Sequence, residues 1–323
     1  MTRARVGMFL PLDLPAAERG RVVAVAADQG VDHLCVGDHV SFFVGAGSDG
    51  LITATALLSR QQELPVYVGL YLLPLRHPVT VARQLASIAE FAPGRLTFGV
   101  GIGGEDRHEI EICGVDPRTR GRRMDESLQV LRALAGGEPV TFEGEFFSLR
   151  DASIAPAPAP PIPLVVGGRS EAAVRRAGRL GDGWLGVWVS PNRFAKVVSQ
   201  LRDEAATAGR DASGFEHAIN VWCGFGAARE AARAPLASAM QAFYRIPFES
   251  FERYSPYGTP EQVAEFLHPY IDAGCSTFNV IPCAADHESA VAAVGEVRRF
   301  LSAETRTADS PMFTPDHPQT AVR

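Results

Sequence analysis

The sequence predicts an α/β fold, and within that class a closed (β/α)8 TIM barrel. Strand-like and helix-like patterns alternate along most of the chain, which is typical of a parallel sheet covered by helices. Eight strand candidates are each followed by a helix, and 323 residues suit a barrel of eight such units. A doubly wound open sheet is the alternative. In a barrel, the residues that follow each strand carry the function.

The first part of the chain predicts four strands and four helices. Short apolar runs predict the strands, and amphipathic runs predict the helices. Gly30 ends the first helix and Pro93-Gly94 ends the third, because both residue types interrupt helices. The expected strands are 5–10, 33–37, 66–73 and 96–100, and the expected helices are 15–29, 51–63, 79–91 and 122–135.

Two features interrupt the alternation in the middle of the chain. A polar, glycine-rich stretch at 101–121 forms an insertion after the fourth strand. Residues 138–149 alternate like a β-hairpin before the fifth strand, with a turn at Glu143-Gly144. The Ala/Pro-rich segment 155–163 is expected to be extended. Because a strand follows it at once, a crossing inside one domain is favoured over a linker between domains.

The alternation then resumes to the end of the barrel. We expect one domain over residues 1–302, and a disordered tail over 303–323, where the chain is polar and contains three prolines. The expected strands are 164–166, 183–189, 217–225 and 277–281, and the expected helices are 170–180, 191–208, 231–244, 260–273 and 287–302.

Composition excludes several classes of protein. The 31 basic and 37 acidic residues give a net charge of −6, which argues against a nucleic acid or an anionic membrane surface as partner. No apolar stretch is long enough to span a membrane, and the first apolar run is too short for a signal peptide. The five cysteines are widely spaced, without a C-x-x-C, and no H-E-x-x-H occurs. We therefore expect a cytoplasmic protein with neither a disulfide framework nor a metal site.

The basic residues are almost all arginine. Only Lys196 is a lysine, so the chain has no Walker A loop, and Schiff-base chemistry would need this one residue in a predicted surface helix.

The first candidate site residues, Asp38 and His39, follow the second strand. An aspartate beside a histidine can orient its imidazole, the side chain best suited to proton transfer near neutral pH. Alternatively, Asp38 caps a turn and His39 is a surface residue.

An apolar segment, Gly69, Leu70, Tyr71 and Leu72, ends the third strand. It would form a wall at the barrel mouth against which a flat ring could lie. Ordinary barrel core is the alternative interpretation.

Glycines follow the fourth strand in the pattern G-x-G-x-x-G, starting at Gly99. The position in the fold and the acidic residues that come next exclude a dinucleotide fingerprint. The absence of side chains at Gly101 and Gly103 would still let a cofactor approach the backbone closely. Glu105 and His108 are candidate acid/base groups, with a solvated loop as the alternative.

A mechanistic signal for an anion site follows the fifth strand, at Gly167, Gly168, Arg169 and Ser170. The glycines let backbone N–H groups turn inward, and Ser170 is a good helix N-cap. The positive end of the helix and the arginine together suit a phosphate. A plain capping turn is the alternative.

Taken together, these motifs resemble the bacterial luciferase-like monooxygenase superfamily, and within it the oxidoreductases that depend on the deazaflavin coenzyme F420. The resemblance runs from about residue 5 to 300. The most specific segments are VGDH at 36–39, LPLRHP at 73–78, GRLTFGVG at 94–101, GRRMDE at 121–126, TFEGEFF at 141–147, VGGRS at 166–170 and GDGW at 181–184.

The resemblance implies a (β/α)8 barrel with a flavin-type ring at its mouth. The ring rests on a bulge with a non-proline cis peptide in such enzymes, and the matching segment here is 69–72. The cofactor phosphate would lie on the loop from Gly167 to Ser170. Asp38 and His39 match the pair that flanks the deazaflavin, and Glu105 matches an acid/base glutamate of sugar-phosphate dehydrogenases in the family.

The resemblance leaves the substrate open. Those dehydrogenases hold the substrate phosphate with lysines, and Lys196 is the only lysine here, so a sugar phosphate is a poor candidate unless arginines replace the lysines. A monooxygenase that uses reduced FMN and a non-catalytic barrel are the alternatives to an F420 enzyme that acts on a small molecule. A homodimer is the expected assembly, since most soluble oligomers are dimers.

Overall fold

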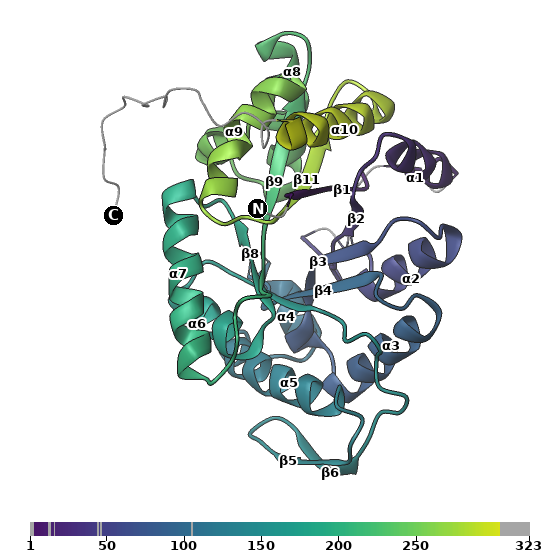
Figure 1. The fold of residues 1–323 in the computed structure, drawn as a ribbon, viewed down its shortest axis with the longest axis vertical. Helices are drawn as coiled ribbons and strands as arrows, with labels where there is room; N and C mark the ends of the chain where they lie inside the picture. The colour runs from purple at the N-terminus through teal and green to yellow at the C-terminus, as the bar shows by residue number, and fades with distance from the viewer. Residues whose placement is uncertain are drawn as a thin grey trace.

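A barrel of parallel strands lies at the centre of the molecule (Figure 1). The computed structural model describes residues 3–11, 14–15, 17–43, 45, 47–104 and 106–303. Within these residues, eight strands follow one another in the order β9-β11-β1-β2-β3-β4-β7-β8, and β8 pairs back to β9. The predicted closed barrel is therefore confirmed. Its strands are β1 (Arg5–Phe9), β2 (His33–Val36), β3 (Val66–Leu72), β4 (Leu96–Gly101), β7 (Leu164–Gly167), β8 (Gly183–Val187), β9 (Glu216–Phe225) and β11 (Thr277–Cys283).

Helices surround the barrel on the outside (Figure 1). Asp49, Ser170, Ser190 and Thr259 each cap a helix by accepting a backbone N–H, as expected of these residue types. No helix in the described part of the chain is long and apolar enough to cross a membrane. The outer helices are α1 (Arg19–Asp28), α2 (Gly50–Arg60), α3 (Pro78–Phe91), α5 (Arg120–Leu134), α6 (Glu171–Leu180), α7 (Pro191–Thr207), α8 (Arg229–Tyr244), α9 (Pro260–Asp272) and α10 (His287–Ala303).

The strands separate two buried apolar layers. Side chains such as Val66 and Val68 of β3 point outward into a large core shared with the helices. Tyr67, which lies between them in the sequence, points inward and packs with Phe9 and Leu185 inside the barrel. This follows from the alternation of side chains along a strand. Both faces of the strands are buried, which is why the sequence reads as continuous apolar runs.

Additional elements extend the basic barrel. The predicted hairpin is confirmed as antiparallel strands β5 (Val140–Glu143) and β6 (Ser148–Ala152), which project beyond α5 in Figure 1. No strand or helix is assigned between β6 and β7, and the bonds before Pro156 and Pro160 there are cis. After α8 come η2 (Phe248–Ser250), η3 (Glu252–Tyr254) and the short strand β10 (Tyr257–Gly258), which pairs with β9.

The sequence missed one helix near the barrel mouth. Helix α4 (Arg107–Ile112) lies in the stretch 101–121, which we read only as a polar insertion. Asp106 caps it, and its carboxylate accepts a hydrogen bond from the backbone N–H of His108 at 2.9 Å. Six residues make fewer than two turns, which is too short for a helical period to be detected. The expected tail lies outside the described residues, apart from Ala303 at the end of α10.

Candidate functional site

The candidate residues gather at the C-terminal ends of the barrel strands, called the mouth below. Asp38 and His39 follow β2, and the segment 69–72 ends β3. Gly101 ends β4, while Gly168 to Ser170 follow β7. Neighbouring parallel strands end at the same side of the barrel, so their following residues converge there. Glu105 lies outside the described residues.

The buried Asp38 side chain bonds to three separate segments of the chain. One carboxylate oxygen accepts hydrogen bonds from the backbone N–H of Gly50, at 2.9 Å, and from the Arg76 guanidinium, at 2.7 Å. The other accepts the backbone N–H of Leu72 at 2.8 Å. Burial raises the pKa of the Asp38 carboxyl, and Arg76 and the two N–H donors oppose that rise. Asp38 thus ties the end of β3 to the start of α2.

The prediction that Asp38 orients His39 is wrong, because Glu109 of α4 does so instead. The His39 Nδ1 atom lies 3.0 Å from the carboxylate of Glu109. The same carboxylate accepts the backbone N–H groups of Val40 and Ser41 at 2.7 and 3.0 Å. The Glu109 side chain is only 3% exposed, whereas that of His39 is 25% exposed. Glu109 therefore fixes both the imidazole and the loop that carries it.

The bond to Glu109 sets the protonation pattern of the imidazole. A carboxylate only accepts hydrogen bonds, so Nδ1 of His39 carries the proton in that contact. In the neutral ring, Nε2 then has a free lone pair that can accept a proton. His108, the other histidine proposed for this loop, is exposed on α4. The partner of His39 is 70 residues away in sequence, so no local motif could have identified it.

The bulge expected from the family resemblance is present in β3. The register with β4 shifts between Val68 and Tyr71, and the peptide bond between Gly69 and Leu70 is cis. Leu70 packs with the inner core of the barrel. Tyr71 packs outward against Phe98, so it adds no side chain to an inner wall at the mouth.

Glycines on the neighbouring strands make room for the Leu70 side chain. A Cβ atom on Gly167 of β7 would lie 2.1 Å from Leu70 Cδ1, far inside van der Waals contact. A Cβ on Gly101 of β4 would lie 3.0 Å from the same atom. Gly103 has a φ of +69°, which few other residues adopt. A side chain at Gly167 would therefore displace Leu70 from its place inside the barrel, and one at Gly101 would press against it.

A chain of polar side chains crosses the barrel interior and ends at the bulge. Asn220 of β9 donates a hydrogen bond to the Gly69 carbonyl at 2.9 Å, and Asn279 of β11 donates to Asn220 at 3.0 Å. The Nε2 atom of His33 in β2 lies 2.7 Å from Oδ1 of the Asn279 side chain. The ring of His33 reaches Asn279 across Gly7 of β1, where a Cβ would lie 2.2 Å from that ring.

These asparagines are functional candidates that the sequence did not reveal. Asn279 is fully buried, and both lie inside strands that read as apolar runs. Burial lowers the pKa of His33 to about 4, so this histidine is neutral near pH 7. The chain is a neutral, hydrogen-bonded support that fixes the carbonyl of the bulge.

The turn after β7, which the sequence predicts as an anion site, leads directly into α6. Ser170 caps α6 by accepting the N–H of Ala173 at 3.2 Å, as predicted. Gly168 has a φ of +130°, and a Cβ there would lie 2.7 Å from Ala173. Its carbonyl accepts the indole N–H of the buried Trp184 at 2.8 Å. Arg169 is exposed beside this turn, so a cation and a helix N-terminus lie together.

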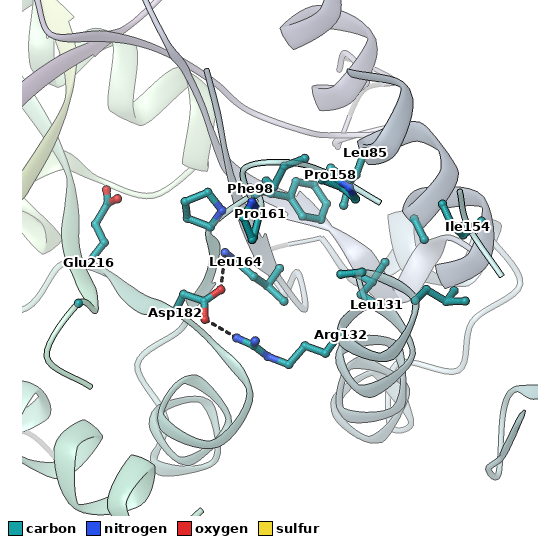
Figure 2. Close-up of a pocket in the computed structure, with 16 residues that line it drawn as sticks. Leu85, Phe98, Leu131, Arg132, Ile154, Pro158, Pro161, Leu164, Asp182 and Glu216 are labelled. Atoms are coloured by element: carbon teal, nitrogen blue, oxygen red, sulfur yellow. Dashed lines mark hydrogen bonds and ion pairs between the residues drawn. The ribbon is translucent and has the colours of Figure 1, made fainter. Parts of the chain in front are cut away.

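The cavity shown in Figure 2 lies at the opposite end of the barrel. It has a volume of about 390 Å³ and opens near the first residues of β7, β8 and β9. Apolar side chains such as Phe98 and Leu131 line it, together with the proline-rich segment before β7. Its polar edge is the ion pair of Arg132 with Asp182, at 2.6 Å. The cavity is therefore separate from the candidate site.

No metal centre is evident in the part of the chain that the structure describes. Within those residues, no three His, Cys, Asp or Glu side chains lie close enough to hold an ion.

Comparison with known proteins identifies relatives over most of the chain. The model of the family described as luciferase-like monooxygenase matches residues 2–256. An uncharacterised protein of Mycobacterium tuberculosis is 34% identical over 149 residues, which are 46% of this chain and 51% of the relative. The chain thus spans about half the length of the curated relatives it matches at this identity. An F420-dependent glucose-6-phosphate dehydrogenase of Rhodococcus hoagii is 28% identical over 302 residues, with 84% of this chain and 88% of the relative covered.

Solved structures share the fold at low sequence identity. An F420-dependent secondary alcohol dehydrogenase in complex with an F420-acetone adduct has a TM-score of 0.82 and 21% identity, over 93% of this chain and 99% of that one. A monooxygenase of Streptomyces bottropensis has a TM-score of 0.80 and 21% identity over the same shares of the two chains.

Proposed function

This chain belongs to the luciferase-like monooxygenase family, and from that premise we propose that it is an oxidoreductase that depends on coenzyme F420. The reaction proposed is hydride transfer between the deazaflavin and a small organic substrate. The observation that carries the proposal is the imidazole of His39, fixed by the buried Glu109 at the same end of the barrel as the bulge at Gly69 and Leu70. The relatives named as F420-dependent enzymes support this choice of cofactor.

The residues at the mouth fit a phosphate-bearing flavin-type ring. A flat ring would lie against Leu70 and the backbone of 69–72, next to the glycines at 101 and 103, where no side chain intervenes. The phosphate would lie on Gly167, Gly168, Arg169 and Ser170, where the N-terminus of α6 favours negative charge. When bound, the deazaflavin supplies the site that accepts or donates the hydride.

His39 is the proposed proton-transfer residue. Its Nε2 lone pair would accept the proton of a substrate hydroxyl, and the Glu109 carboxylate would stabilise the imidazolium that forms. In the opposite direction the imidazolium would protonate a carbonyl oxygen. Asp38 acts through the backbone of Leu72 and holds the bulge in place. Glu105, which lies outside the described residues, stays a prediction as a second acid/base group.

The test is a fluorescence titration of the purified protein with F420, and separately with FMN under oxidising and reducing conditions. We expect binding of F420 in the micromolar range and much weaker binding of FMN. Preferential binding of reduced FMN would contradict the proposal and favour a monooxygenase. One of the structural relatives is named as a monooxygenase. The loss of F420 binding in Arg169→Glu, with an unchanged melting temperature, would support the phosphate loop.

A further inference from the structure

Aromatic rings form a continuous path over the mouth of the barrel, between His39 and the turn that carries Arg169. We call this path the aromatic arc. It comes from four parts of the chain: the loop after β2, the residue after β8, the C-terminal half of β9, and the last turn of α8. Its members are Phe42, Trp188, Trp222, Phe243 and Tyr244.

Each ring of the arc contacts the next. The His39 imidazole lies 4.1 Å from the Phe42 ring, and Phe42 lies 5.0 Å from Phe243. Phe243 lies 5.9 Å from Trp222 and 4.8 Å from Tyr244 (all distances between ring centroids). Such spacings are those of packed aromatic pairs.

The far end of the arc reaches the proposed anion site. Trp188 lies 4.9 Å from Tyr244, between ring centroids, and the Arg169 guanidinium lies 5.3 Å above the Trp188 ring. Trp188 follows β8 directly and has a φ of +50°, an uncommon conformation for a residue with a side chain. The arc therefore connects the two parts of the site that the sequence predicted separately.

Charge is nearly absent along the arc. The Trp222 indole N–H donates to the Tyr244 hydroxyl at 3.1 Å, so the polar atoms of these two residues satisfy each other. Two cations stack on rings at its margins: Arg169 on Trp188, and the exposed Arg245, at 4.7 Å, on Phe43, the neighbour of Phe42. Lys196, the only lysine of the chain, lies on α7. A phosphate ester placed against the Phe243 ring would lose water there, which is unfavourable unless a cation such as Arg245 turns to pair with it.

We propose that the substrate is an uncharged aromatic alcohol or ketone, held against Phe243 and Trp222 with its oxygen at Nε2 of His39. This inference rests on the proposed function. In the oxidising direction, the C–H bond of the carbinol carbon breaks and its hydride passes to the deazaflavin. The O–H bond breaks, its proton passes to His39 and then to solvent, and a C=O double bond forms. The reverse sequence reduces the ketone.

The test compares two probes by calorimetric titration of the protein saturated with F420. Acetophenone represents the aromatic ketone, and glucose 6-phosphate represents the substrate named for the Rhodococcus hoagii relative. We expect acetophenone to bind at least about tenfold more tightly, which corresponds to about 1.4 kcal/mol. Tighter binding of glucose 6-phosphate, or no binding of either probe, would overturn the inference.

Variants locate the binding on the arc. Phe243→Ser should weaken acetophenone binding about tenfold, and Phe243→Leu, which keeps an apolar side chain, about threefold. The matched control is Phe91→Ser, since Phe91 is 49% exposed at the end of α3, on the opposite side of the barrel. Equal affinities of Phe243→Leu and Phe91→Ser would sink the inference, even if Phe243→Ser did not fold.

The same titrations separate the two proposals. If F420 does not bind but acetophenone still binds in a Phe243-dependent way, the proposed function fails and the arc stands as an apolar binding site. If F420 binds and glucose 6-phosphate is the preferred probe, the proposed function stands and the inference on the arc fails.

Discussion

His39 holds its place through one ring nitrogen, and in the proposed function the other ring nitrogen transfers the proton. The contact with Glu109 occupies Nδ1, and both the loop backbone and the ring depend on the same carboxylate. This division of roles is common in enzymes that transfer protons, where a second group orients the imidazole. It also explains why the neighbouring Asp38 is not needed for that purpose.

Replacing His39 with alanine should lower turnover about 100-fold or more, since general acid–base catalysis contributes about 10²–10⁴-fold. The affinity for F420 should stay within about threefold, because the proposed ring and phosphate contacts lie elsewhere. Steady-state kinetics and the fluorescence titration measure the two effects separately. In Glu109→Gln the side chain can still accept hydrogen bonds, so the loss of turnover should be smaller. Unchanged turnover in His39→Ala would remove this histidine from the mechanism.

At the scale of elements, strands β4 and β7 present bare backbone to the bulge of β3. The space that Gly101 and Gly167 leave empty is the space that Leu70 fills. The strands and the bulge therefore fit only as a set, and the fit is a property of three elements, not of one residue.

The variant Gly167→Ala should disturb the proposed ring site more than the fold. The new Cβ would lie 2.1 Å from Leu70 Cδ1, so the Leu70 side chain must move away from β7. Overpacking of this kind costs about 1–3 kcal/mol of stability, and we expect F420 affinity to fall at least about tenfold. Gly20→Ala in α1 is the control, because its Cβ would meet nothing within 4 Å. Equal F420 affinity in both variants would contradict a ring site at Leu70.

At the scale of the whole molecule, two buried histidines make stability depend on pH. Burial lowers the pKa of both His33 and His217 from 6.5 to about 4. The unfolded chain therefore takes up protons near pH 6.5, while the folded protein does so only near pH 4. The stabilisation is complete above about pH 6.5 and is lost as the pH falls toward 4.

Between pH 7 and pH 5, each of these histidines should remove about 2 kcal/mol from the free energy of unfolding. Urea unfolding at the two pH values measures the loss. His217→Gln should reduce the pH dependence by about half, since only His33 then contributes. A free energy that does not change between pH 7 and pH 5 would mean that neither histidine is neutral by burial.

The sequence predicted the fold in detail because the barrel repeats one simple pattern. Each barrel strand has both faces buried, so it appears in the sequence as an apolar run. At least one helix lies between each barrel strand and the next along the chain, and its amphipathic pattern marks it. The features that the sequence analysis missed are a short helix and contacts between residues far apart in sequence. Helix α4 is too short to show a period, and Glu109 meets His39 only after folding. Asn220 and Asn279 could not be found, because one polar residue inside an apolar run carries no local signal of its partner.

The near absence of lysine also allows the protein to be labelled at a single side chain. Lys196 is exposed on α7, in the outer ring of helices, and no other lysine exists. An amine-reactive label would therefore attach to one side chain, besides the α-amino group. Protein whose α-amino group is blocked would be tethered to a sensor chip through this one position and so in one orientation, which suits direct measurement of cofactor capture and release.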